Sequence, residues 1–289
     1  MQPSVDAPVA VRLLGDFSMD VCGEPVGPWR GGKARGLFQY LLLNRGRLVV
    51  RERLQDVLWP GVDPARGGTS LKVAAHALRE VISRIPDEAG LCLVYQDRGY
   101  LLRAERVWID VDEFEQACTT GADRTAMHLY RGDFLGGEAA CWAVEQREWY
   151  RSLALRVLDR LRDGALRRGD DIELVSWCRR SLDIDPSRET TYQALMAAHA
   201  RFGELDRVHS WYRLCLRRLR EDFGVEPTPE THRVFVEALR RGMPGRPATR
   251  VAGSAGARAG GGARAGGVPR HAAGADGTAG AALPRPAAP

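Results

Sequence analysis

Hydrophobic and polar positions alternate along the start of the chain. Residues 10–26 contain three short stretches of this kind, AVRLLG, FSMDV and EPVG, and turn-forming Gly-Asp and Cys-Gly-Glu sequences separate them. Alternation with a period of two, bounded by turn residues, is typical of short strands. This segment therefore predicts a small β-meander.

Three stretches with a helical period follow the meander. Residues 33–44 and 51–59 each repeat apolar side chains at helical spacing, and the pair Pro60-Gly61 ends the second stretch. A third helix is expected from Thr69 or Ser70 to Ile85. Each of these patterns predicts a helix that turns one face toward a core.

The third helix carries two stripes of opposite character. The apolar stripe predicts the buried face and consists of Leu71, Ala75, Leu78, Ile82 and Ile85. Every side chain of the polar stripe can donate a hydrogen bond, and this stripe consists of Lys72, His76, Arg79 and Ser83. Taken alone, the polar stripe fits an ordinary solvated helix face as well as a binding surface.

A β-hairpin is predicted after the third helix. Two strand-like stretches, LCLVYQ and YLLR, flank the sequence Asp97-Arg98-Gly99, which places Arg98 at the hairpin tip. Three helices followed by a hairpin form the element order of a winged helix-turn-helix domain. In that domain the third helix enters the major groove of DNA, so this order favours a DNA-binding role for the polar stripe.

The second half of the chain, residues 110–242, is helical in pattern and contains a repeat. Four features recur after 34 residues: Gly169-Asp170 as Gly203-Glu204, Leu174 as Val208, Trp177 as Trp211, and Leu182 as Leu216. This is the tetratricopeptide period, in which each helix pair buries its apolar face against its neighbours. The predicted fold class is mainly α with a small β component: an N-terminal winged helix-turn-helix (α+β) followed by an all-α tetratricopeptide-like domain.

Charge is distributed unevenly among these segments. The net charge of +5 comprises +3 in residues 1–108, −3 in residues 109–242 and +5 in residues 243–289. Within the first segment, residues 28–84 hold 11 cations and 4 anions. Such a local excess attracts a phosphate backbone, and it surrounds the predicted third helix.

The length of 289 residues predicts two domains. We expect a disordered N-terminus over residues 1–9, the winged helix over residues 10–105 and the helical domain over residues 109–242. Residues 243–289 contain no aromatic residue and are dominated by Gly, Ala, Pro and Arg, so they predict a disordered tail. A solvated linker and a nonspecific nucleic-acid arm are both compatible with that tail.

The N-terminal half resembles the DNA-binding domain of the Streptomyces antibiotic regulatory protein (SARP) family, which is of the OmpR type. The resemblance covers residues 11–102 and rests on the Leu-Trp-Pro of residues 58–60, the Ala-Leu-Arg of residues 77–79 and the pair Gly99-Tyr100. Residues 109–239 resemble the bacterial transcriptional activation domain of the same family. That likeness rests on these matches: IDVD at 109–112 with Phe114, LYRGDFL at 129–135, Trp142 with Glu145 and Arg147, Asp185-Pro186 with Glu189, and FGVEP at 223–227.

Roles for individual residues follow from this reading. The recognition helix would present Lys72, His76, Arg79 and Ser83, and the wing would present Arg98. Four further cations near the first two helices are candidates for phosphate contacts: Lys33, Arg35, Arg51 and Arg53. The resemblance implies binding to direct repeats in double-stranded promoter DNA as a homodimer, recruitment of RNA polymerase or its sigma factor through the helical domain, and activation of a secondary-metabolite gene cluster.

Other classes of function find less support in the sequence. The chain holds neither a GxSxG elbow nor an HExxH motif, and its histidines are isolated, so we expect no enzyme, no cofactor and no metal site. The alternatives to a DNA-binding activator are a tetratricopeptide-type interaction scaffold and a regulator that holds a small molecule in its helical groove.

Two further expectations concern the compartment. No apolar run approaches the roughly 20 residues of a membrane-spanning helix, and the N-terminus lacks the pattern of a signal peptide, so a cytoplasmic, nucleoid-associated protein is expected. The six cysteines form no CxxC pair and predict buried free thiols.

Overall fold

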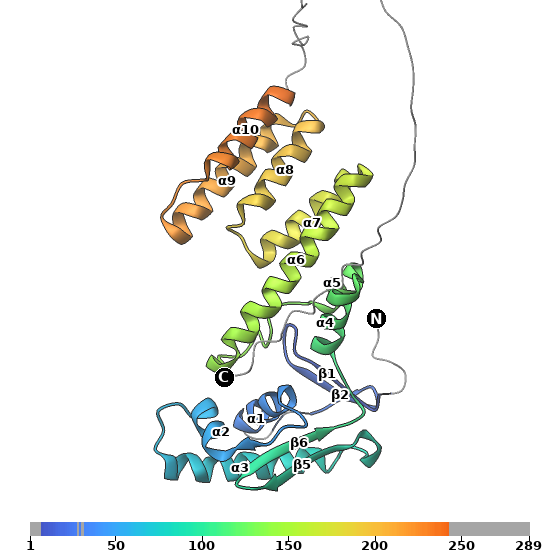
Figure 1. The fold of residues 1–289 in the computed structure, drawn as a ribbon, viewed down its shortest axis with the longest axis vertical. Coiled ribbons are helices and arrows are strands. Elements are labelled where there is room, and N and C mark those ends of the chain that lie inside the picture. The colour runs from blue at the N-terminus through green and yellow to red at the C-terminus, as the bar shows by residue number, and fades with distance from the viewer. Residues whose placement is uncertain (1–6, 28, 30–31, 243–289) are drawn as a thin grey trace, which may run out of the picture.

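The computed structural model describes residues 7–27, 29 and 32–242 (Figure 1). The predicted disordered tail and the first six residues lie outside the described residues. The elements are β1 (Val9–Arg12), β2 (Ser18–Val21), β3 (Glu24–Pro25), α1 (Gly32–Leu43), β4 (Val49–Val50), α2 (Arg51–Leu58), α3 (Pro64–Ile82), β5 (Leu91–Gln96), β6 (Gly99–Ala104), β7 (Val107–Ile109), α4 (Asp110–Thr120), α5 (Asp123–Leu129), α6 (Val144–Arg168), α7 (Asp171–Ile184), α8 (Glu189–Arg201), α9 (Leu205–Phe223) and α10 (Pro229–Gly242).

The predicted meander forms the first three strands of a sheet with the order β3-β2-β1-β7. β1 pairs antiparallel with β2, and it begins at Val9, which is fully buried, one residue before the expected domain boundary. β7 was not predicted. It pairs parallel with β1, with Val9 opposite Val107, so the segment expected to link the two halves is a strand of the first sheet.

The winged helix-turn-helix order is confirmed. Helices α1, α2 and α3 pack together, and β6 pairs with both β4 and β5 in a second sheet. Asp97 and Arg98 form the two-residue turn of the β5–β6 hairpin, and both have positive φ, as a type I′ hairpin turn requires. The mainly helical fold class with a small β component is confirmed as well.

The third helix begins earlier than the sequence predicted. It starts at Pro64, not at Thr69 or Ser70, and it ends at Ile82, before the expected Ile85. The side chain of Asp63 caps its first turn by accepting from the amide of Ala65 at 3.0 Å. The consecutive glycines at 67 and 68 disfavour a helix in the sequence. In the structure both are buried. The additional first turn of α3 therefore follows from the Asp63 cap and from close packing at these glycines.

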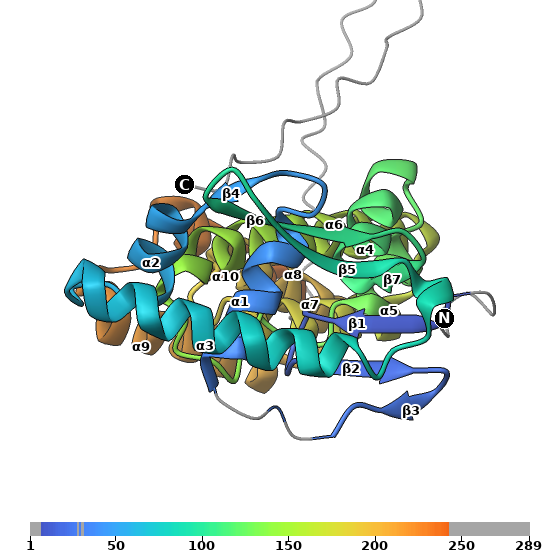
Figure 2. The same ribbon diagram turned by 90° about the horizontal axis from the view of Figure 1, so that it is seen from below.

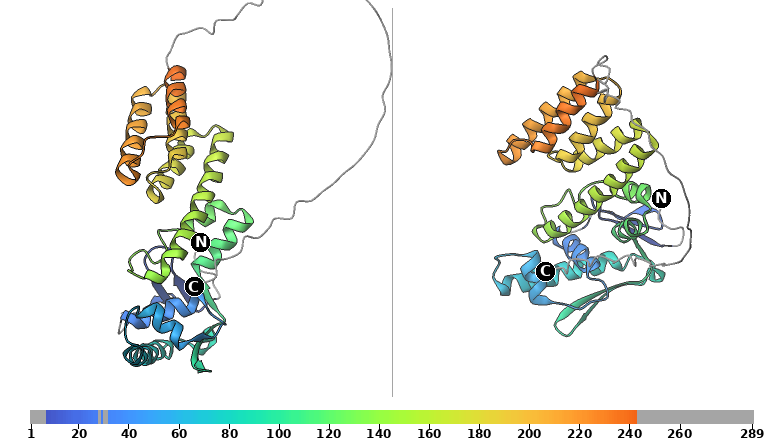
Figure 3. Two further views of the ribbon diagram at one scale, coloured as in Figure 1. Left: turned by 60° about the vertical axis from the view of Figure 1, so that its left-hand side comes forward. Right: turned by 45° about the horizontal axis from the view of Figure 1, so that its top comes forward.

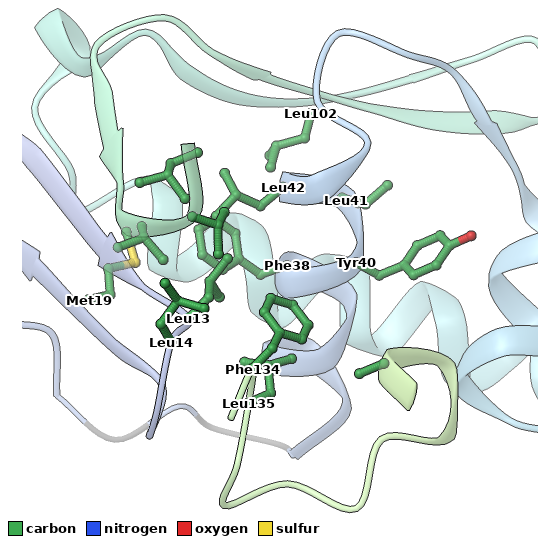
Figure 4. Packing of buried hydrophobic residues seen from close by; sticks show 14 of the residues in the cluster. Leu13, Leu14, Met19, Phe38, Tyr40, Leu41, Leu42, Leu102, Phe134 and Leu135 are labelled. Atoms are coloured by element: carbon green, nitrogen blue, oxygen red, sulfur yellow. The ribbon is translucent and has the colours of Figure 1, made fainter. Parts of the chain in front are cut away.

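The two halves of the chain share one core. Residues 133–136 bond to residues 13–15, directly after β1: Leu135 N donates to Leu13 O at 2.8 Å and Gly15 N donates to Asp133 O at 3.0 Å. Figure 4 shows Phe134 and Leu135 in the same cluster as α1 side chains such as Phe38. The largest buried cluster consequently includes residues from the winged helix and from α4 and α6.

Asp110 strengthens this junction. Its carboxylate is 1% exposed and accepts from the amides of Leu13 at 2.8 Å and Leu14 at 2.9 Å. Arg147 of α6 fixes the 133–136 segment, because its guanidinium donates to the carbonyls of Phe134 at 2.9 Å and Leu135 at 3.1 Å. The resemblance singled out these motifs, and the structure shows that they join the two halves.

The 34-residue repeat is confirmed in the helical half. Helices α6 to α10 stack as successive antiparallel neighbours in both views of Figure 3. Gly169 ends α6 with φ of 69°, and its counterpart Gly203 follows α8 with φ of 72°. Leu174 and Val208 occupy equivalent buried positions, 1% and 0% exposed.

The prediction of buried cysteines holds only in part. Cys178 and Cys215 are buried, whereas Cys22, Cys92 and Cys141 are exposed. Cys92 lies on β5, an edge strand, where alternate side chains point to solvent. None of the described helices is long and apolar enough to cross a bilayer.

Candidate nucleic-acid interface

Helix α3 lies at the end of the molecule opposite the repeats. Figure 1 places it with the β5–β6 hairpin at the bottom, far from α8 to α10, and Figure 2 shows it uncovered from that side. The predicted apolar stripe faces the core, since Leu71, Ala75 and Leu78 are fully buried. The structure exposes all four side chains of the predicted polar stripe: Lys72, His76, Arg79 and Ser83.

Three further exposed residues extend this face and were not predicted. Arg66 lies on the first turn of α3, which the sequence prediction left outside the helix, and Thr69 lies at the expected start of that helix. Val73 is 64% exposed beside Lys72. An exposed apolar side chain among donors suits the methyl group of thymine in a major groove. The exposure of Val73 could have been predicted from the sequence, because this residue falls outside the apolar stripe of the third helix.

The side chains of the polar stripe differ in how they are held. The guanidinium carbon of Arg79 lies 5.9 Å from the ring centroid of Tyr100 on β6, within cation–π range. His76 Nε2 lies 3.7 Å from a carboxylate oxygen of Glu80. Ser83 follows the last residue of α3, and its hydroxyl donates to the carbonyl of Glu80 at 3.0 Å. Arg79 is thus the cation of the stripe that rests against the wing.

The wing places Arg98 at an exposed tip. Its carbonyl accepts from the amide of Arg51 at 3.1 Å, which ties the hairpin turn to the first residue of α2. Arg51 and Arg53 are both partly exposed on the first turn of α2. The structure therefore groups Arg98, Arg51 and Arg53 at the wing side of the domain.

Lys33 and Arg35 each make a contact within the chain that the sequence did not predict. The ammonium of Lys33 donates to Leu58 O at 2.6 Å at the end of α2, and Nε of Arg35 lies 3.2 Å from Oε1 of Glu138. Glu138 belongs to the segment that precedes α6, so Arg35 contacts the helical half, whereas the bond of Lys33 lies within the winged helix. The sequence showed their charge but not the tertiary fold that turns α1 toward this junction.

No group of three His, Cys, Asp or Glu side chains in residues 7–27, 29 and 32–242 could hold a metal ion.

Comparison with known families identifies the helical half. Residues 104–239 match the model of the bacterial transcriptional activator domain. Together, this domain and the winged helix before it define the class of protein: a transcriptional regulator.

The chain is homologous to SARP-type regulators, which confirms the resemblance seen in the sequence. It is 27% identical over 253 residues to the transcriptional regulator RedD of Streptomyces coelicolor, covering 80% of this chain and 70% of that protein. It is also 27% identical over 238 residues to the regulatory protein AfsR of Streptomyces griseus, covering 75% of this chain. The chain spans only 24% of that AfsR.

A solved structure shares the fold. Mycobacterium tuberculosis EmbR, in complex with a low-affinity phosphopeptide, superposes with a TM-score of 0.58 and 21% identity. The match covers 81% of this chain and 66% of the EmbR chain. The arrangement of winged helix and helical repeats is therefore common to both proteins.

Proposed function

We propose that this chain is a transcriptional activator that binds promoter DNA through α3 and the β5–β6 wing. The observation that carries the proposal is the outward face of α3, where Lys72, His76 and Arg79 are exposed at the end of the molecule opposite the repeats. A helix with this face enters a major groove about 12 Å wide, and arginine is the commonest partner of guanine there.

Positioning contacts come from the wing side. Arg98, Arg51 and Arg53 are the proposed phosphate contacts, since they flank α3 on a part of the chain with a basic excess. Lys33 and Arg35 are not among them, because Lys33 is bonded to the carbonyl of Leu58 and Arg35 is paired with Glu138. Arg66 joins the set as a cation on the first turn of α3.

The remaining parts of the proposed function are carried over from the resemblance to the SARP family. The chain binds direct repeats as a homodimer on DNA, and the helical domain engages RNA polymerase or its sigma factor to activate a secondary-metabolite gene cluster. This activity places it in the cytoplasm, on the nucleoid. The exposure of α6 to α10 beyond the winged helix supports such a division of roles, because the repeats remain accessible while α3 is on DNA.

A footprint of the full chain on the promoters beside its own gene tests the proposal. Arg79→Ala is expected to weaken specific binding by about 1–3 kcal/mol and to relax specificity at one base pair. Arg167→Ala, which removes an exposed arginine of α6, is the matched control and leaves the footprint unchanged. An Arg79→Ala footprint identical to that of the unmodified chain contradicts the recognition-helix assignment.

Salt dependence separates this function from an interaction scaffold. For a DNA binder, the logarithm of the binding constant falls with the logarithm of salt concentration by about 0.9 for each phosphate neutralised. Arg98→Ala is expected to reduce that slope by about one and to weaken all sequences alike. A scaffold shows no DNA binding to titrate.

A further inference from the structure

A hollow of about 300 Å³ opens where the winged helix meets the activator domain. α1 and the end of α2 form one wall, and residues 137–142 form the other. Its volume lies at the lower end of the range of about 300–1,000 Å³ that small-molecule sites occupy. Because the two walls come from different halves of the chain, an occupant would touch both.

The charge of this hollow favours an anion. Lys33 and Arg35 line it, and Glu138 is the one carboxylate among the described lining residues. Lys33 uses one of its three N–H donors on Leu58 O at 2.6 Å. Arg35 is 41% exposed, and its Nε is the atom 3.2 Å from Glu138. Both cations therefore retain donors that a carboxylate of a ligand can accept from.

Gln39 supplies a second, independent observation. Its side chain is fully buried in α1 and lines the same hollow. Nε2 donates to Oε1 of Glu138 at 2.6 Å, while Oε1 of Gln39 has no hydrogen-bond partner among the described residues. A buried acceptor without a donor is unfavourable, so a ligand hydroxyl or amine that donates to Oε1 of Gln39 would be stabilising.

The rest of the lining is apolar. Val57 and Pro60 contribute from the end of α2, and Trp142 contributes from the opposite wall. Trp142 is held by edge contact with Tyr40, with the ring centroids 5.3 Å apart. An aromatic surface fixed in this way suits a flat ring in the ligand.

We propose that this hollow binds a small aromatic hydroxy acid. Its carboxylate accepts from Lys33 and Arg35, its ring packs between Val57 and Trp142, and its hydroxyl donates to Gln39. Binding stabilises the junction between the DNA-binding half and the activator half. This site goes beyond the proposed function, and its test requires no DNA.

The test is calorimetric titration of the full chain with 4-hydroxybenzoate as the probe. Saturable binding at one site per chain is expected, together with a rise in the unfolding temperature. The uncharged 4-hydroxybenzamide is the matched ligand and is expected to bind at least about tenfold more weakly, since it lacks the carboxylate.

Variants locate the binding. Arg35→Gln, and independently Lys33→Met, are expected to weaken 4-hydroxybenzoate at least about tenfold, while the α6 variant Arg167→Gln stays within about twofold of the unmodified chain. No saturable binding, equal binding of the benzamide, or unchanged affinity in folded Arg35→Gln and Lys33→Met overturns the proposal. Equally tight binding of inorganic phosphate that depends on Arg35 also overturns it, because the hollow would then be an inorganic anion site.

Discussion

Single residues at the junction explain why family motifs occur where they do. Asp110, in the IDVD motif, accepts from two backbone amides of the other half of the chain. Burial raises the pKa of its carboxyl to about 6, and its two amide donors only partly counter this effect. Burial of this carboxylate is unfavourable, but the carboxylate supplies the acceptor that the amides of Leu13 and Leu14 would otherwise lack.

Asp110 is expected to make stability depend on pH in a defined direction. Below about pH 4 the carboxyl is protonated in both states, and between about pH 4 and 6 only the unfolded state ionises, which favours unfolding. The free energy of unfolding of the unmodified chain, relative to Asp110→Ala, should therefore fall by about 3 kcal/mol as pH rises through this window.

Urea unfolding of both chains at several pH values measures this difference in the free energy of unfolding. Asp183→Ala, which removes an exposed carboxylate of α7, is the control and should show no such trend. If the free energy of unfolding of the unmodified chain relative to Asp110→Ala stays constant or grows from pH 4 to 6, the assignment of the raised pKa to Asp110 is contradicted.

At the scale of elements, α3 depends on its first turn. Asp63 accepts from the amides of Ala65 at 3.0 Å and Arg66 at 3.4 Å, and this cap starts the helix ahead of two glycines. A Cβ on Gly68 would lie 3.1 Å from side-chain atoms of Arg51 and Gln55, so the glycine permits α2 and α3 to approach closely.

Removal of this cap should loosen the first turn of α3. Asp63→Ala is expected to lower the free energy of unfolding by about 0.5–2 kcal/mol, because two amide donors lose their acceptor. Denaturant unfolding measures the loss, and Asp56→Ala on the exposed face of α2 is the control. Equal stability of the two variants would show that the first turn does not depend on its cap.

Elements with a local pattern could be predicted from the sequence, and elements set by distant pairing could not. The helices, the hairpin at Arg98 and the 34-residue repeat each carry a period or turn signal of their own. β7 is three residues long, and its partner β1 lies almost a hundred residues away, so nothing nearby marks it as a strand.

The candidate site divides in the same way. Exposure of Lys72, His76 and Arg79 followed from helical spacing. The direction of Lys33 and Arg35 did not, because it depends on Leu58 and Glu138, and those contacts exist only once α1, α2 and residues 137–142 have packed together.

At the scale of the whole molecule, the winged helix is incomplete without part of the activator domain. β7 completes the first sheet, and Asp110 and residues 133–136 bond to the residues that follow β1. A fragment of residues 1–105 exposes that apolar surface and leaves the amides of Leu13 and Leu14 without their acceptor.

Truncation tests this dependence. The fragment 1–105 is expected to unfold at a lower denaturant concentration than the full chain or to be insoluble, whereas the fragment 1–170, which retains α4 to α6, should unfold in one cooperative transition. Circular dichroism during urea titration measures both. A fragment 1–105 with the midpoint of the full chain would show that the junction adds nothing to the winged helix.

The shared sheet also has a consequence for promoter architecture. Because β1 pairs with β7, and residues 13–15 bond to the 133–136 segment, α3 and the start of the repeats are joined through a shared sheet and core. On the proposed function, the repeats then project from a fixed side of the double helix. Insertion of about 5 bp between operator and promoter should abolish activation, and insertion of about 10 bp, one full turn, should restore it in a reporter assay.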